Sequence, residues 1–150
     1  MTYYITMPRA SKKATKPPAK PRNPEIFRFI DFFVKTVEKI HSIKPTVVRG
    51  KDGALVSLAL RKLPVEKLET LAVWFLARKK NLRPLIGTML SKKILEELER
   101  EMNKPSFWKD IDKLMDDYYP RQKTLNMWQP FTHADITNIK EEVARNMRKL

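Results

Sequence analysis

The chain has 150 residues, a formal net charge of +14 and no cysteine. This length suits one domain with a tail, and the lack of cysteine excludes disulfides, thiolate metal sites and cysteine nucleophiles. No apolar run approaches the ~20 residues of a membrane helix, and Met1–Met7 is too short and polar for a signal peptide, so we expect a cytoplasmic protein without a membrane span.

Residues 1–22 form a distinct segment, with six cations, no acid and several prolines. Such a composition buries too little apolar surface to offset the entropy that is lost when a chain becomes ordered. We therefore predict a disordered basic arm over residues 1–22, followed by one helical domain over residues 23–150. The cations of this arm are candidates for contacts with nucleic-acid phosphates: Arg9, Lys12, Lys13, Lys16, Lys20 and Arg22.

The first helix is predicted to begin at Asn23-Pro24-Glu25 and to continue to about Ile40. Asparagine is a favoured N-cap, proline suits the first helical position, and an acid there complements the helix dipole. Apolar residues recur at helical spacing, and others widen the apolar face beyond one stripe. The extra width predicts a partner-binding surface formed by Phe27, Phe32 and Val34.

Further apolar patterns predict four helices in the middle of the chain. Turn residues between Lys44 and Gly53 separate the first helix from the second, and Pro64 separates the second from the third, because proline breaks an ongoing helix. Ser106 is expected to cap the fifth helix. These four helices are predicted over about residues 52–63, 64–80, 86–103 and 107–119.

The end of the chain adds one more predicted helix. Thr132 and Asp135 have the spacing of a capping box, which marks the start of a helix. Only three glycines occur, and no segment has a convincing strand pattern. We therefore predict an all-α fold, a compact bundle of about five to six short helices.

The sequence carries no signature of catalysis or of a cofactor site. Its three glycines match no phosphate-binding loop. His41 and His133 lie near predicted helix ends, where polar residues are ordinary, and Asp112 and Asp116 share a helix face with lysines close enough to pair with them. We therefore expect a protein that is not an enzyme and needs neither cofactor nor metal.

Positive charge is concentrated in the first half of the chain. Residues 35–83 hold twelve Lys and Arg against four acids, whereas residues 84–150 hold twelve against eleven. Four cations between Arg78 and Arg83 exceed what a helix C-terminus uses, so the surplus predicts a nucleic-acid interface. Trp74 and Trp128 could stack on bases, although helical aromatics usually belong to the core. The candidate contacts within the domain are Lys44, Arg49, Lys51, Arg61, Lys62, Arg78, Lys79, Lys80, Arg83, Lys92 and Lys93.

The run from Ser42 to Leu98 also resembles a known domain. The motifs are Ile43-Lys44-Pro45, Asp52-Gly53-Ala54, Leu58-x-Leu60, Glu66-x-x-x-x-Leu71-x-x-Trp74-Phe75 and Ile86-Gly87-x-Met89-Leu90-Ser91-Lys92. They resemble the small helical domain in replication proteins of phages and other mobile elements, the replisome organisers and helicase loaders akin to DnaD-type primosomal proteins. The resemblance implies DNA binding and recruitment of a replicative helicase. Such proteins often carry a winged-helix domain upstream; the basic arm in that place here favours an accessory or loader-like role.

Three functions remain open from the sequence. The leading hypothesis is a DNA-replication accessory protein that binds single- or double-stranded DNA non-specifically and recruits a helicase or primosome partner. The second is a protein-interaction module that acts as a small regulator or inhibitor. The third is a transcription regulator with the second and third helices as a helix-turn-helix, although the turn between Leu63 and Val65 is short for that motif.

Overall fold

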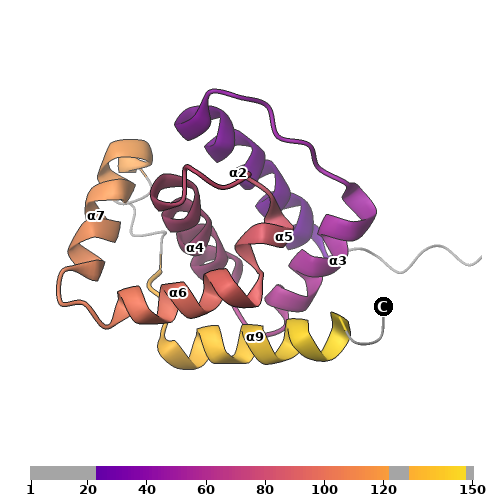
Figure 1. Cartoon of the computed structure of the whole chain (residues 1–150). Helices are drawn as coiled ribbons and strands as arrows, with labels where there is room; N and C mark the ends of the chain where they lie inside the picture. Colours follow the sequence, from indigo (N-terminus) through magenta and orange to yellow (C-terminus); the bar gives the residue numbers. More distant parts are fainter. Residues whose placement is uncertain (1–22, 122–128, 148–150) are drawn as a thin grey trace, which may run out of the picture.

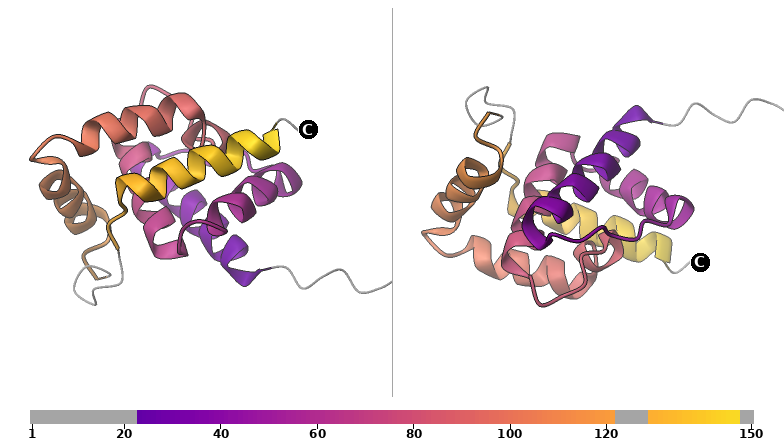
Figure 2. Two further views of the ribbon diagram at one scale, coloured as in Figure 1. Left: turned by 90° about the horizontal axis from the view of Figure 1, so that it is seen from below. Right: turned by 90° about the horizontal axis from the view of Figure 1, so that it is seen from above.

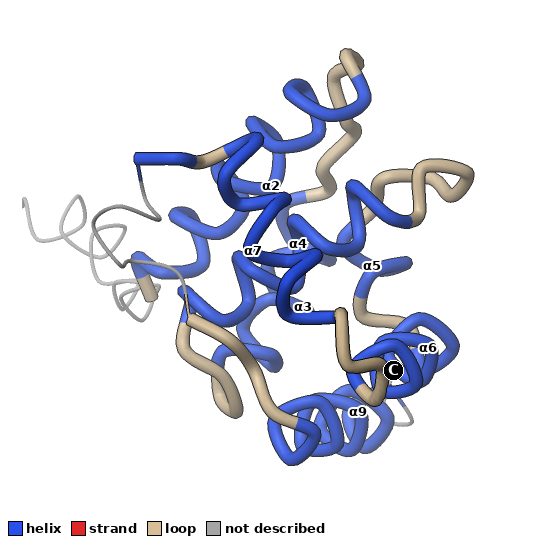
Figure 3. The backbone as a smooth tube through the Cα atoms, turned by 90° about the vertical axis from the view of Figure 1, so that its left-hand side faces the viewer, coloured by secondary structure: helices blue, strands red, loops and turns tan. Residues whose placement is uncertain are grey.

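The computed structural model describes residues 23–121 and 129–147, and all regular structure in these ranges is helical (Figures 1 and 3). The predicted all-α class is thereby confirmed. The predicted arm, residues 1–22, lies outside the described residues. The helices are α2 (Pro24–His41), α3 (Arg49–Leu60), α4 (Val65–Arg78), α5 (Ile86–Met89), α6 (Lys92–Met102), α7 (Phe107–Tyr118) and α9 (His133–Met147).

Helix α4 lies at the centre of the molecule, where it packs against α2, α3 and α7 (Figure 1). Every residue from Leu68 to Leu76 is buried. A helix that is covered on all sides belongs to the interior, and this burial explains why its apolar pattern is so dense. Glu69 is the charged residue of this run, and its carboxylate accepts hydrogen bonds from Arg28 Nε at 3.3 Å and Nη2 at 3.0 Å.

Helix α9 crosses the ends of the bundle and packs against both α3 and α6, as the left view of Figure 2 shows. The predicted capping box at its start is confirmed. The Thr132 hydroxyl accepts from the Asp135 amide at 3.1 Å, and the Asp135 carboxylate accepts from the Thr132 amide at 2.8 Å. This reciprocal pair fixes the point at which the chain enters α9.

The first predicted helix is confirmed as α2, and its Asn23 side chain accepts from the Glu25 amide at 3.0 Å. The broad apolar face of α2 is largely covered by the chain itself. Phe32 is 8% exposed and stacks on Tyr119 at 5.0 Å between ring centroids, which corrects the expectation that it faces a partner. Val34 is half-buried, and Phe27 remains 40% exposed.

Two predicted helix boundaries need correction. The second helix begins at Arg49, three residues before the predicted start. The Asp52 carboxylate accepts a hydrogen bond from the Val48 amide at 2.8 Å and caps the helix there, so Gly50 and Gly53 lie within its first turns. The predicted fourth helix is two helices, α5 and α6, with extended backbone at Ser91 between them (φ −69°, ψ 151°). The Ser91 hydroxyl donates to the Thr88 carbonyl at 2.7 Å and accepts from the Ile94 amide at 3.4 Å, so one side chain ends α5 and caps α6.

Candidate binding groove

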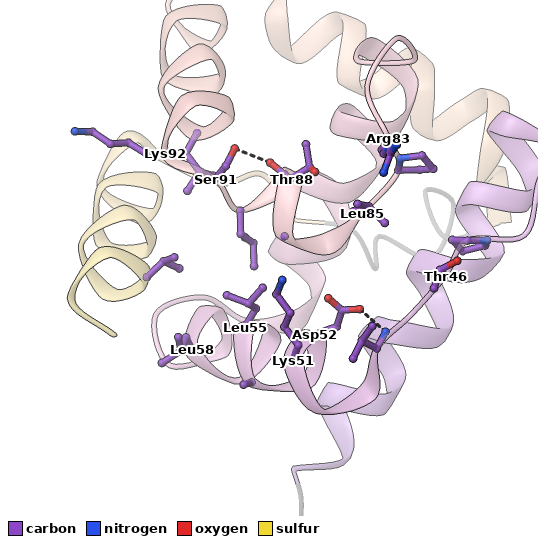
Figure 4. A pocket seen from close by; sticks show the side chains of 18 of the residues that line it. Thr46, Lys51, Asp52, Leu55, Leu58, Arg83, Leu85, Thr88, Ser91 and Lys92 are labelled. Carbon is purple, nitrogen blue, oxygen red and sulfur yellow. Dashed lines mark hydrogen bonds between the residues drawn. The ribbon is translucent and has the colours of Figure 1, made fainter. Parts of the chain in front are cut away.

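A groove of about 1250 Å³ lies between α3, α5, α6 and α9 (Figure 4). Three distant parts of the chain line it, residues 43–58, 83–95 and 140–144. Its floor is aliphatic, and Figure 4 shows Leu55 and Leu58 pointing into it from α3. The larger apolar residues of the lining are Ile43, Val48, Leu55, Leu58, Leu85, Leu90, Leu95 and Val143.

The groove depends on two local features that the sequence did not reveal, the Asp52 cap of α3 and the break between α5 and α6 at Ser91. The Asp52 cap turns residues 43–48 along the N-terminal end of α3, which leaves Ile43 and Val48 51% and 55% exposed at the edge. The break at Ser91 sets α5 at an angle to α6, so Leu90 and Leu95 line the opposite wall. Exposed aliphatic side chains beside a hollow are a common mark of a binding surface.

Within the part of the chain that the structure describes, five cations line the groove together with Asp52. The Asp52 carboxylate is already engaged by the Val48 amide. Figure 4 shows Lys51 rising from α3 into the groove, whereas Lys92 extends away from it. The five are Lys44, Lys51, Arg83, Lys92 and Lys140.

The cations of the groove differ in how far the chain neutralises them. Lys92 lies 3.9 Å from Glu96, and Lys140 pairs with Glu99. By contrast, no acid within residues 23–121 and 129–147 lies within ion-pair distance of three groove cations. These three are Lys44, Lys51 and Arg83, all exposed.

The sequence predicted four of the five groove cations, and it missed Lys140. Lys140 lies in the part of the chain where acids and bases nearly balance, so its charge did not stand out. The fold alone places α9 beside α3 and α6. No signal within the sequence assigns Lys140 to the same surface as Lys44 or Arg83.

Other predicted contact residues divide into paired and unpaired groups. Lys79 lies 2.5 Å from Glu97, and Arg61 and Lys62 lie 3.2 and 3.8 Å from Glu142. Lys93 is exposed on the first turn of α6. Arg49, Arg78 and Lys80 are exposed and, within the described ranges, have no acid within ion-pair distance. The six cations of the predicted arm lie outside the described residues.

The pKa values of the paired acids reflect these contacts. The hydrogen bond from Lys79 lowers the pKa of Glu97 below its ordinary value, and the neighbouring charge of Lys93 acts in the same direction. Burial raises the pKa of Glu142, but the hydrogen bonds from Arg61 and Asn146 outweigh it, so the net shift is downward. Both acids therefore hold their cations as carboxylates at neutral pH.

The helix-turn-helix alternative fails for a different reason from the one that the sequence suggested. Four residues separate α3 from α4, which is a suitable turn length, so the prediction that the turn is too short was wrong. However, α4 would have to enter the major groove of DNA, and it is buried along its length. Trp74, at 3% exposed, belongs to this core, and Trp128 lies outside the described residues.

Other kinds of site find no support in the described residues. His41 Nε2 lies 3.0 Å from the Leu76 carbonyl oxygen and ties the end of α2 to α4. The part of the chain that the structure describes holds no group of three or more His, Cys, Asp or Glu that could bind a metal, and none of its helices is long and apolar enough to cross a membrane. Comparison with known proteins finds no matching family, no matching curated protein and no matching solved structure.

Proposed function

We propose that the chain is a non-catalytic accessory protein that binds DNA non-specifically. The observation that carries this proposal is a set of exposed cations that the described acids leave without an ion-pair partner. Among the predicted contact residues of the domain, these unpaired cations are Lys44, Arg49, Lys51, Arg78, Lys80, Arg83 and Lys93. Residues 1–22 add six more cations and no acid.

Exposed Lys and Arg side chains suit the phosphate backbone, because each phosphate that they neutralise releases condensed counterions. Such contacts fix a protein on nucleic acid without reading its sequence. Sequence reading needs an element that reaches the base edges, and the buried helix α4 does not offer one. The proposed binding is therefore independent of sequence and uses features that single and double strands share.

The proposed setting is the replication of a phage or mobile element, in a helicase-loader or primosome-like role. The sequence resemblance between Ser42 and Leu98 supports this setting. Three of its motifs, Ile43-Lys44-Pro45, Asp52-Gly53-Ala54 and the run from Ile86 to Lys92, contribute residues to the walls of the groove. A replicative helicase is the expected protein partner.

A fluorescence-anisotropy titration with a labelled duplex and a labelled single strand, at about 50 to 200 mM salt, tests DNA binding. We expect affinity to fall steeply with salt, by a slope of ~0.9 for each duplex phosphate contact. Replacing the six cations of residues 1–22 by glutamine in the full chain is expected to reduce that slope. Undetectable or salt-independent binding by the unaltered chain would exclude the proposal.

A further inference from the structure

We propose that the groove between α3, α5, α6 and α9 binds an acidic amphipathic helix of a partner protein. This surface shares Lys44, Lys51 and Arg83 with the proposed phosphate contacts, but it differs from a simple phosphate-binding patch because its floor is aliphatic and its cations lie around that floor (Figure 4). The proposal does not depend on DNA binding. It names the kind of partner that the groove fits.

The floor of the groove indicates that its occupant supplies apolar side chains. A nucleic-acid backbone would use the lining cations and leave Ile43 and Val48 in water. Bases bind by stacking on aromatic side chains, and none of the described residues that line the groove is aromatic. Aliphatic side chains on one face of a helix, by contrast, fill such a groove at spacings of three and four residues.

The charge of the lining indicates that the rest of the occupant is acidic. Lys44, Lys51 and Arg83 have no acidic partner among the described residues, and the carboxylate of Asp52 is held by the Val48 amide. An acid on the occupant would therefore meet a cation that has no competing internal pair. Such complementarity favours acidic partners and disfavours basic ones, since like charges placed together repel.

A second, smaller hollow lies on the other side of α3. This hollow of about 390 Å³ beside Phe27 shares Gly50 and Ala54 with the groove. Gly50 has open space where a Cβ would be, so no described residue fills the junction between the two hollows. The proposed occupant does not use this second hollow, so Phe27, the exposed member of the predicted partner-binding set, lies outside the proposed site.

Two occupants from the chain itself fit less well. Residues 1–22 carry only positive charge, of the same sign as the cations of the groove. Helix α7 of a second copy has four aspartates, but its apolar residues Phe107, Ile111, Leu114 and Met115 are buried in its own core. It therefore offers charge without an apolar face.

The test uses the full chain and a fluorescein-labelled synthetic peptide of about 18 residues, roughly five helical turns. The peptide has leucine at positions i, i+3, i+4 and i+7 of each repeat and glutamate elsewhere. One control peptide has the same composition in an order without a one-sided apolar face, and a second has lysine in place of glutamate. Anisotropy measures the affinity of each peptide.

We expect the patterned acidic peptide to bind at least about tenfold more tightly than either control peptide, a difference of ~1.4 kcal/mol. The double variant Ile43→Ser, Val48→Ser removes apolar surface from the groove without changing charge. It is expected to weaken peptide binding about tenfold while leaving the melting temperature and DNA affinity unchanged. The variant Phe27→Ser is the matched control, an exposed apolar residue that does not line the groove.

Several results would overturn the proposal. Equal binding of the reordered peptide would show that charge alone attracts it. A larger loss with Phe27→Ser than with the double variant would move the site to α2. If the double variant loses DNA affinity and the peptide does not bind, the groove belongs to DNA; if it abolishes a concentration-dependent dimer seen by sedimentation, the groove belongs to a second copy. Because DNA binding and peptide binding are measured separately, either proposal can fail without the other.

Discussion

The seam between α3 and α9 and the groove beside it use positive charge in opposite ways. At the seam, Arg61, Lys62 and Arg145 surround the buried Glu142, at 3.2, 3.8 and 3.6 Å. Around the groove, Lys44, Lys51 and Arg83 have no such acid among the described residues. Both regions involve α3, so the difference does not come from the number of cations but from where the acids lie.

This comparison distinguishes the cations that contribute to stability from the cations that are available for binding. Several of the ion pairs join segments that are distant in sequence, such as α2 to α4, the end of α3 to α9 and the end of α4 to α6. An ion pair of this kind holds two elements together, and removing one partner leaves the other charge without compensation. The unpaired cations form no ion pair within the described chain, so their charge is available for a partner.

Removing a paired cation should give the largest effect on stability. Arg28 binds the buried Glu69 through two hydrogen bonds, and Arg28→Met would leave that carboxylate unpaired. We expect the free energy of unfolding to fall by about 2 kcal/mol, below the ~3–5 kcal/mol of a fully buried pair. The expected loss is smaller than for a fully buried pair because the Arg28 side chain is 41% exposed and water screens its charge.

Urea unfolding measures this change. Lys35→Met, at an exposed position on the same helix, is the matched control and should change the unfolding free energy by less than about 0.5 kcal/mol. If the two variants are equally stable, the pair between Arg28 and Glu69 contributes nothing to the fold.

Removing unpaired cations should instead reduce DNA affinity. The triple variant Arg78→Gln, Lys80→Gln, Arg83→Gln is expected to lower duplex affinity roughly tenfold or more and to reduce the salt slope by up to ~0.9 for each phosphate that is no longer neutralised. Its melting temperature should stay within a few degrees of that of the unaltered chain, because these side chains make no ion pair with a described acid. Anisotropy across salt and circular dichroism measure the two quantities.

The control for this variant carries the same change in net charge near the other end of the domain, at Lys104, Lys109 and Lys113. Glutamine at these three positions should affect DNA binding less. An equal loss of affinity in both variants would mean that total charge, and not its position, determines binding.

Much of the fold could be predicted because its signals are local. Asn23 and the pair Thr132 and Asp135 cap helices through contacts within three residues, and these caps were predicted correctly. Ser91 and Asp52 are also local caps, but Ser91 lies inside an apolar pattern that continues across it, and Asp52 lies among glycines that are typical of a turn. Periodicity therefore merged α5 with α6, and the glycines placed the start of α3 three residues late.

The site could be predicted only in part, because pairing depends on contacts between distant segments. The sequence placed Arg61 and Arg83 in one class of basic residues. Arg61 meets an acid 81 positions further along the chain, and nothing near either residue in the sequence signals that contact. The aliphatic floor was missed for the same reason, since its residues come from three distant parts of the chain that only the fold brings together.

Arg78 and Lys79 are neighbours in the sequence and allow paired and unpaired cations to be compared at adjacent positions. Arg78 is unpaired and exposed, whereas Lys79 is paired with Glu97, with both side chains about three-quarters buried, at 26% and 23% exposed. Lys79→Gln should lower the unfolding free energy by about 0.5–1 kcal/mol and leave DNA affinity nearly unchanged. Arg78→Gln should do the reverse, with unaltered stability and a salt slope reduced by ~0.9. If Lys79→Gln weakens DNA binding as much as Arg78→Gln, the division into paired and unpaired cations is wrong.

The smallest expected effect is on the pH dependence of stability, because few acids contribute and one opposes the others. Interactions with cations keep the pKa values of Glu97 and Glu142 below the ordinary 4.5, so their stabilisation is complete above that pH and is lost as the pH falls through the lower folded-state values. Burial raises the pKa of Glu69 more than its bond to Arg28 lowers it. Protonation of Glu69 therefore stabilises the fold, and this contribution is complete below pH 4.5 and is lost as the pH rises through the raised folded-state pKa.

Urea unfolding from about pH 7 to pH 3 measures the balance of these terms, and we expect a net loss of stability on acidification. Glu142→Gln should be less stable than the unaltered chain at neutral pH, because it takes the carboxylate away from Arg61, Lys62 and Arg145. The two stability curves should approach one another as the pH falls through the lowered folded-state pKa of Glu142, because that carboxylate then becomes protonated in the unaltered chain. The same substitution at the exposed neighbour Glu141 controls for the change in net charge. If the difference in stability between Glu142→Gln and the unaltered chain did not shrink on acidification, Glu142 would act through packing and not through its charge.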